Sequence, residues 1–248
     1  MMHFTYQLHT NAQRFKDFIL NIKAHFNKNN STIHKARNEL KIIAYKDTST
    51  VVKSFKVPNI INKIIYSYFR KSKAKKSYEH SLKIETFTPN PIGYIEFYKY
   101  GLLSESYFIS EEFVYEFTIR EPLLDVHFPN REALFRAFAC FTLELHNAGI
   151  FHNDYSPGNI LIKKENESYI FKIVDINRMK FLKLSENLRA KNFSKLWADE
   201  KVLTIIAKEY KKHYQCNESF VTKVLYYSNK NKKVKNFKKR LKGKPVND

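Results

Sequence analysis

The residues best suited to do chemistry lie in two neighbouring segments, FHNDYSPGNILI at 151–162 and FKIVDIN at 171–177. Asp154 precedes Asn159 by five positions, and Asp175 directly follows the second apolar run. Carboxylate and amide oxygens suit Mg²⁺, which keeps its other positions for water and phosphate oxygens. Two such ligands beside a further carboxylate are the groups that Mg²⁺-assisted phosphoryl transfer requires.

A β-hairpin is the element expected to bring these residues together. Residues 160–162 and 169–174 are predicted to be strands, and the polar residues between them are predicted to turn the chain. This pairing places Asn159, at the start of the first strand, beside Asp175, at the end of the second. Asp154 is then one loop away.

The composition is that of a folded and strongly basic protein. A hydrophobic content of 43% argues against a disordered chain, and 248 residues suffice for one large core or two small lobes. The formal net charge of +20 favours an anionic partner, such as nucleic acid, an anionic membrane surface or a phosphorylated glycolipid. The Lys-, Asn- and Ile-rich profile also fits an AT-rich coding sequence, which would make part of this charge compositional.

The sequence gives no sign of secretion or of a metal-thiolate site. The N-terminus lacks an apolar signal region, and no apolar run approaches the roughly 18 residues that span a bilayer. We therefore expect a cytoplasmic protein. Cys140 and Cys216 have no CxxC spacing and fall in predicted helices, so we expect reduced, inert thiols.

The first part of the chain is predicted to contain a small antiparallel sheet with helices. Residues 1–30 show no firm period, and HFNKNNS is predicted to be a loop. Residues 40–45 and 50–55 are predicted to form a hairpin around a turn at 46–49. Lys53 lies in its second strand, where a lysine taken alone would occupy the solvated face. The other predicted elements are a helix after Pro58 over 60–69, a basic helix at 70–87 that contains Glu79, and strands at 91–101 and 105–110 joined by a turn at 102–104.

The second part, from about residue 119, is predicted to be mainly helical. Asn130 and Gly149 are expected to begin and end a buried helix, Gly149 in the left-handed conformation. Helices should also follow Asp175. The basic cluster at 70–76 and the Lys- and Arg-rich stretch at 230–244 are either solvated surfaces or sites that bind an anion or an anionic membrane.

The order of Lys53, Glu79, Asp154, Asn159 and Asp175 resembles that of the protein-kinase superfamily. The resemblance implies a bilobal α+β fold, with an N-lobe at 1–118 and a C-lobe at 119–248. It also implies that Lys53 contacts the ATP phosphates and that Glu79 holds this lysine. Asp154 would accept the proton of the acceptor hydroxyl, while Asn159 and Asp175 would ligate Mg²⁺.

Other positions of the motif depart from those of protein kinases. His152-Asn153-Asp154 stands where kinases have His-Arg-Asp, so His152 is counted with the catalytic residues and the arginine that senses phosphorylation is missing. No glycine precedes Gly93, so the Gly-rich phosphate loop is absent, and no Ala-Pro-Glu segment follows. These departures indicate an unswitched kinase that acts on a small molecule or sugar.

The motifs HNDYSPGNIL, VDINRM, VVKSFKVPN and FRKSKAKKSYE look like those of the lipopolysaccharide kinase family, over about residues 37–181. This resemblance implies an ATP- and Mg²⁺-dependent kinase that phosphorylates Kdo, in preference to heptose, in the lipopolysaccharide inner core. We also expect a monomer. It would be peripheral on the cytoplasmic face of the inner membrane, where basic segments contact the anionic surface.

Two other interpretations stay open. One is a small-molecule kinase or an atypical protein kinase, although the basic surface disfavours a cationic substrate. The other is an inactive kinase fold that binds a membrane or nucleic acid. No interleaving of basic and base-stacking aromatic residues is evident, so we expect no nucleic-acid partner. The adenine-contacting hinge is expected within 111–118.

Overall fold

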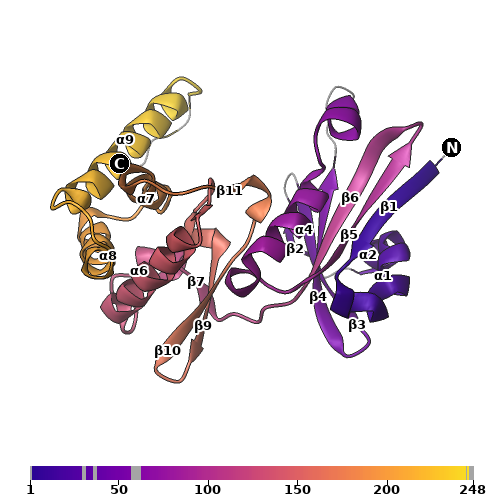
Figure 1. The fold of residues 1–248 in the computed structure, drawn as a ribbon, viewed down its shortest axis with the longest axis horizontal. Helices are drawn as coiled ribbons and strands as arrows, with labels where there is room; N and C mark the ends of the chain where they lie inside the picture. Colours follow the sequence, from indigo (N-terminus) through magenta and orange to yellow (C-terminus); the bar gives the residue numbers. More distant parts are fainter. Residues whose placement is uncertain (1, 30–31, 36–37, 57–62, 244, 246–248) are drawn as a thin grey trace. The chain divides into compact units, whose positions relative to one another are not determined.

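The computed structural model describes residues 2–29, 32–35, 38–56, 63–243 and 245, and it forms two compact units at 1–114 and 115–248 (Figure 1). The division lies shortly before residue 118, where the sequence predicted a lobe boundary. Each unit has a hydrophobic core of its own.

In the described part of the first unit, six strands form one antiparallel sheet. Their order across the sheet is β1 (Met2–Leu8), β5 (Pro91–Lys99), β6 (Leu102–Glu111), β4 (Thr48–Lys56), β3 (Asn38–Tyr45) and β2 (Thr32–Lys35). The hairpin predicted around residues 46–49 is β3–β4, in which Tyr45 pairs with Thr48.

Helices cover both faces of this sheet (Figure 1). On one face, α1 (Lys16–Leu20) and α2 (Ile22–Lys28) share a core with Val52 and Ile95. On the other, α4 (Lys73–Ile84) packs on Phe55 and Tyr94. Since successive strand residues point to opposite faces, Lys53 shares the α4 face with Phe55.

The prediction of a loop in the N-terminal thirty residues was wrong. This segment contains β1, η1 (Thr10–Phe15), α1 and α2. Residues 3–7 of β1 are all exposed, because the strand forms an edge of the sheet and is held by backbone pairing to β5. An edge strand exposed on both faces has no burial alternation for sequence reasoning to detect. HFNK belongs to α2, and the buried Lys41 donates to the carbonyls of Phe26 and Asn29 at the end of that helix.

The turn predicted at 102–104 was also wrong. These residues belong to β6, and the chain turns at Tyr100 and Gly101, which have φ of 54° and 75°. A two-residue hairpin turn with positive φ at both positions matches the strand twist, and glycine supplies one of them without strain. Of the helix predicted over 60–69, residues 60–62 lie outside the described residues, and Ile65–Phe69 form the π-helical segment η2.

The second unit is mainly helical, with short strands. Its helices are α5 (Arg120–Leu124), α6 (Arg131–Asn147), α7 (Glu186–Asn192), η6 (Phe193–Lys195), α8 (Glu200–His213) and α9 (Phe220–Arg240). Its strands are β7 (Phe117–Thr118), β9 (Ile160–Glu165) and β10 (Ser168–Ile173) in one sheet, and β8 (Ile150–Phe151) with β11 (Lys180–Phe181) in another.

Helix α6 is the buried helix that the sequence predicted. Leu134, Phe135 and Phe138 on its apolar face are fully buried, and Gly149 follows its end with φ of 73°. Asn130 stands at the N-cap position but makes no side-chain cap hydrogen bond. In the described ranges, no helix is both long and apolar enough to cross a bilayer.

Candidate active site

The predicted hairpin is present in the second unit and brings Asn159 next to the residue before Asp175. Ile160 pairs with Ile173, and the N–H of Val174 donates to the carbonyl of Asn159 at 2.9 Å. The first strand is longer than predicted, the second begins and ends one residue earlier, and the chain turns at residues 166–167. The register therefore places Asn159 and Asp175 at the same end of the hairpin.

Asn159 also ties this end of the hairpin to the loop that carries Asp154. Its amide Nδ2 donates to the backbone carbonyl of Asp154 at 2.9 Å and to Ser156 Oγ at 3.1 Å. The amide nitrogen thus closes the loop, which leaves the amide oxygen as the atom that a cation would use. Together with the Asp175 carboxylate it makes a hard oxygen donor set that fits Mg²⁺.

His152 connects the loop to the strand that precedes Asp175. The side chain is fully buried, its Nε2 lies 3.0 Å from the carbonyl of Val174, and its Nδ1 accepts from the N–H of Asp154 at 3.1 Å. A carbonyl can only accept and an N–H can only donate, so the ring is neutral with the proton on Nε2. Burial lowers the pKa of His152, which favours this neutral form. We therefore assign His152 a positioning role rather than a part in proton transfer.

Asp175 adopts a left-handed backbone conformation with φ of 57°. For a non-glycine residue this conformation costs roughly 1–2 kcal/mol, although Asp and Asn tolerate it best. Asn177 donates from Nδ2 to Asp175 Oδ1 at 2.8 Å and so holds one carboxylate oxygen. Asn177 is a site residue to which the sequence analysis assigned no role.

Asn153, which replaces the arginine of protein kinases, has a definite structural role. Its side-chain amide donates to the backbone carbonyl of Arg178, in the segment that follows Asp175. The loop and this segment are therefore joined by a neutral hydrogen bond. Such a link requires no phosphorylated partner.

Lys53 and Glu79 lie on the predicted elements of the first unit. Lys53 is on β4, with its ammonium 5.4 Å from the centroid of the Phe55 ring, on the sheet face that α4 covers. Glu79 is on α4, and each of its carboxylate oxygens lies 2.8 Å from the ammonium of Lys71. The sequence predicted Glu79 as the partner of Lys53, and the pairing with Lys71 was not foreseen.

A buried polar network, which the sequence analysis missed, supports the loop that bears Asp154. His146 on α6 contacts the Tyr210 hydroxyl through Nδ1 at 2.9 Å and Asn192 Oδ1 through Nε2 at 3.0 Å. Asn192 then donates to the backbone carbonyl of His152 at 2.9 Å, and Arg189 donates to the Tyr210 hydroxyl. Three helices are thereby connected to the loop that bears Asp154.

This network predicts that the folded state loses stability at acid pH. Burial lowers the pKa of His146 from 6.5 to about 4. Because the pKa of His146 is lowered in the folded state, the stability that depends on the neutral ring is complete above about pH 6.5. It is lost as the pH falls toward 4. This loss is on the order of 3 kcal/mol, and the buried His152 adds to it. Urea unfolding between pH 7 and 4 should show it.

His146→Gln should be less stable at pH 7, because its buried partners are disturbed, but should lose less stability on acidification. His127→Gln, at an exposed histidine before α6, is the matched control and should keep the wild-type slope. An unchanged slope in His146→Gln would contradict the assignment.

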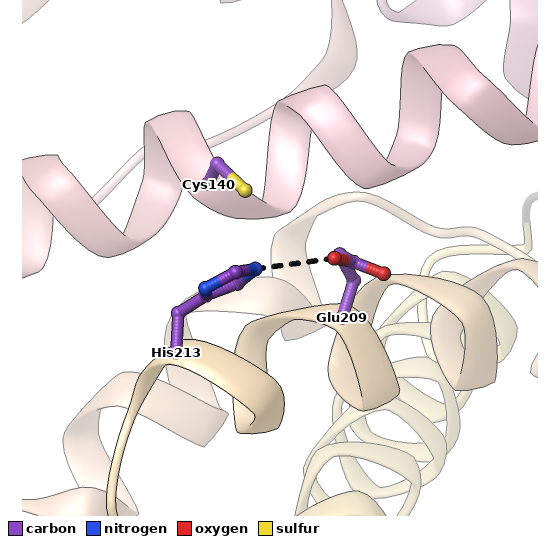
Figure 2. Close-up of side chains that lie close together, drawn as sticks. All are labelled: Cys140, Glu209 and His213. Carbon is purple, nitrogen blue, oxygen red and sulfur yellow. Dashed lines mark hydrogen bonds and ion pairs between the residues drawn. The ribbon is translucent and has the colours of Figure 1, made fainter.

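Cys140, Glu209 and His213 form a cluster of metal-ligating types that lies outside this loop (Figure 2). Figure 2 shows Cys140 on α6 facing the two α8 residues, and the ligand atoms lie within 4.8 Å of one another. Glu209, however, is already paired with Lys212 at 2.7 Å and Arg136 at 2.6 Å. The hydrogen bond from Lys212 is the largest cause that lowers the pKa of Glu209, to about 2. We interpret the cluster as an ion-pair network between helices, and burial raises the pKa of the Cys140 thiol, as expected for an inert cysteine.

No family model matches this sequence, and no curated protein matches it. Solved structures do match. The chain is similar to WaaP, solved in complex with acyl carrier protein, with a TM-score of 0.63 and 13% identity over 93% of this chain and 99% of that chain. It also matches the kinase domain of PknI from Mycobacterium tuberculosis, with a TM-score of 0.43 and 12% identity over 76% of each chain.

At this level of identity the likeness to WaaP establishes the fold. The chain has the α+β, protein-kinase-like fold that was predicted from its sequence, with an antiparallel N-terminal sheet and a mainly helical second unit. Within this fold it is similar to WaaP over nearly its whole length.

Proposed function

We propose that this protein is an ATP-dependent kinase of the lipopolysaccharide kinase family that phosphorylates a sugar hydroxyl, Kdo or heptose, of the lipopolysaccharide inner core. The observation that carries the proposal is the arrangement of Asp154, Asn159 and Asp175 around one end of the hairpin, in a chain similar in fold to WaaP. Lys53, on the strand predicted for it, supports the ATP assignment.

In this proposal each residue has one task. The Asn159 amide oxygen and the Asp175 carboxylate would hold Mg²⁺, which would supply positive charge to the phosphates of ATP. Asp154 accepts the proton of the sugar hydroxyl as that oxygen attacks the γ-phosphorus, the bond to the bridging oxygen breaks and ADP leaves. The neutral His152 keeps Asp154 in register with the strand that ends before Asp175. Lys53 contacts the phosphates.

The function is tested by incubating the purified protein with Mg·ATP and lipid A–core acceptors that end in Kdo or in heptose. We expect one phosphate to be transferred to the Kdo-containing acceptor. If every Kdo- and heptose-containing acceptor stays unmodified, the substrate assignment fails. Transfer to choline or to an aminoglycoside instead would favour the small-molecule kinase. ATP binding without any transfer would favour the inactive binding module.

The acceptor is attached to a lipid, and the outer face of α9 supports the further proposal that this helix binds an anionic membrane surface. Tyr226, Val234, Phe237 and Leu241 recur at intervals of eight, three and four residues, so they share one helix face, and all four are exposed. The basic residues near this apolar stripe are Lys230, Lys238 and Arg240, which are also exposed. Apolar residues flanked by cations are typical of helices that lie in the membrane interface.

Phe237→Glu should therefore weaken binding to phosphatidylglycerol vesicles by about tenfold or more. The phenylalanine, now 62% exposed, would lose roughly 1.5–3 kcal/mol of burial in the interface, and the new carboxylate would be repelled. Vesicle co-sedimentation at several salt concentrations measures the effect. Leu124→Glu, at an exposed leucine of α5, is the matched control. Equal binding of Phe237→Glu and wild type would exclude this surface.

A further inference from the structure

The chain's single tryptophan lies in a segment that is attached to the catalytic loop. Asn192, at the end of α7, donates to the backbone carbonyl of His152. The chain then passes through η6, which ends at Lys195, and reaches Trp197. The polypeptide is thus fixed to the loop that bears Asp154 only a few residues before the tryptophan.

Helix α9 is fixed against this same segment by two hydrogen bonds. Asn231 donates from Nδ2 to the carbonyl of Ser194 at 2.8 Å, and Lys232 donates from Nζ to the carbonyl of Ala198 at 2.8 Å. These bonds lie on either side of Trp197 in the sequence. They determine which residues of α9 face the indole ring.

Two lysines of α9 face the Trp197 ring. The ammonium of Lys235 lies 5.0 Å from the ring centroid and that of Lys239 lies 6.0 Å from it. Trp197 is half-buried and has φ of 59°, a conformation that costs roughly 1–2 kcal/mol for a bulky residue. Strained backbone of this kind is concentrated at binding sites and active sites.

The cations around the ring lack acidic partners. Among the residues that the structure describes, Lys195, Lys235 and Lys239 have no carboxylate within 4 Å, whereas Lys211, Lys212 and Lys223 of α8 and α9 do. Partial desolvation and then the neighbouring charge of Lys195 lower the pKa of Lys235, while the charge of Asp154 raises it. The ammonium groups of Lys235 and Lys239 therefore share the Trp197 ring, and the charges of Lys195 and Asp154 act on Lys235 from nearby.

Packing alone does not explain this cluster. A lysine that only covers an aromatic ring normally keeps its ammonium in water, away from other cations. Lys232, less than one turn before Lys235, is satisfied by a backbone carbonyl. Lys235 and Lys239 instead share one ring, and the positive charges of Lys195 and Lys239 disfavour the charged form of Lys235, an effect that a bound anion would offset.

We propose that Trp197, Lys195, Lys235 and Lys239 form the subsite that binds the acceptor sugar, with the sugar ring against the indole and an acidic group of the sugar on the lysines. The inference rests on the proposed function, since it assigns the acceptor of that site. The ligand class is a sugar with a carboxylate or a phosphate. Asn192 joins this segment to the loop that bears Asp154, so an acceptor bound against Trp197 would lie near the base.

The single tryptophan allows the subsite to be tested without catalysis. The full chain is titrated with free Kdo, with a heptose phosphate, with glucose and with inorganic phosphate, and the Trp197 fluorescence is recorded. We expect a saturable change with at least one of the two acidic sugars, and the better ligand distinguishes a carboxylate from a phosphate. If glucose binds as well as the acidic sugars, the role of the lysines is wrong. If inorganic phosphate binds as tightly as the acidic sugars, the proposed contact between the sugar and the Trp197 ring is wrong.

Variants supply the matched comparison. Lys235→Gln should weaken binding of the acidic sugar by about tenfold or more, the usual effect of losing a charge-assisted contact. Lys233→Gln removes an exposed charge on the same helix, on a different face from Lys235, and should bind as wild type does. Equal binding by the two variants would overturn the subsite.

Kinetics with a detergent-solubilised acceptor separate the two proposals. Lys235→Gln should raise the acceptor KM by about tenfold and leave the KM for ATP unchanged. If the fluorescence titration gives the expected result but no sugar is phosphorylated, the proposed function fails and the binding site stands. If transfer occurs and Lys235→Gln and Lys233→Gln share one acceptor KM, the subsite fails and the function stands.

Discussion

Replacement of Asp154 by asparagine is expected to lower the rate of phosphoryl transfer about 10³-fold, within the usual range for loss of a general base. The amide has the shape of the carboxylate but cannot accept the proton of the acceptor hydroxyl. The loop should stay intact, because its hydrogen bonds use backbone atoms of residue 154, the N–H to His152 and the carbonyl to Asn159. Initial rates with the lipid A–core acceptor measure the effect.

The control for Asp154→Asn is its affinity for Mg·ATP, measured by calorimetry, together with its unfolding midpoint in urea. Both should stay close to those of the wild type, so that the loss concerns only the chemical step. A variant that retains a tenth or more of the wild-type rate would show that Asp154 is not the base. A variant that unfolds at lower urea concentrations would show that the side chain has a structural task as well.

Replacement of Asp175 by asparagine is expected to abolish detectable transfer for a different reason. The carboxylate that we assign to Mg²⁺ is lost, so the affinity for Mg·ATP should fall by about tenfold or more, the loss expected when a charge-assisted contact is removed. The fold should be retained, since Asn tolerates the left-handed backbone, with φ of 57°, as well as Asp does. Calorimetric titration with ATP at fixed Mg²⁺ measures this change.

Asp175→Ala distinguishes the backbone conformation of residue 175 from the metal-binding role of its carboxylate. Alanine lacks both the carboxylate and the tolerance for positive φ, so it should bind Mg·ATP weakly and also lose roughly 1–2 kcal/mol of stability relative to Asp175→Asn. Unchanged nucleotide affinity in both variants would place the metal site elsewhere. Equal stability of the two variants would contradict the strained conformation of Asp175.

The parts of the site that were predicted from the sequence are local in the chain. The hairpin follows from two short β-rich runs with polar residues between them, and its register follows once the turn is short. Asp154 is joined to Asn159 by a hydrogen bond that spans only five residues. The apolar face of α6 and the left-handed Gly149 were likewise encoded by local periodicity and by one glycine.

The parts that were missed depend on contacts between distant residues or on exposed elements. His146 and Asn192 are far apart in sequence, and each lies in a helix whose polar residues show no special spacing. Strand β1 is exposed on both faces, so no alternation marked it. The cluster of Lys235 and Trp197 arises only when α9 packs on the segment after α7, which no local pattern indicated.

The central claim is most directly tested by mass spectrometry of the lipopolysaccharide core from cells that lack this protein. We predict that the core loses one phosphate from Kdo, or from heptose, in the deletion strain. The wild-type protein should restore the phosphate, and Asp154→Asn, present at the same level, should not. A core with the same phosphate content in the deletion strain and the parent would contradict the account.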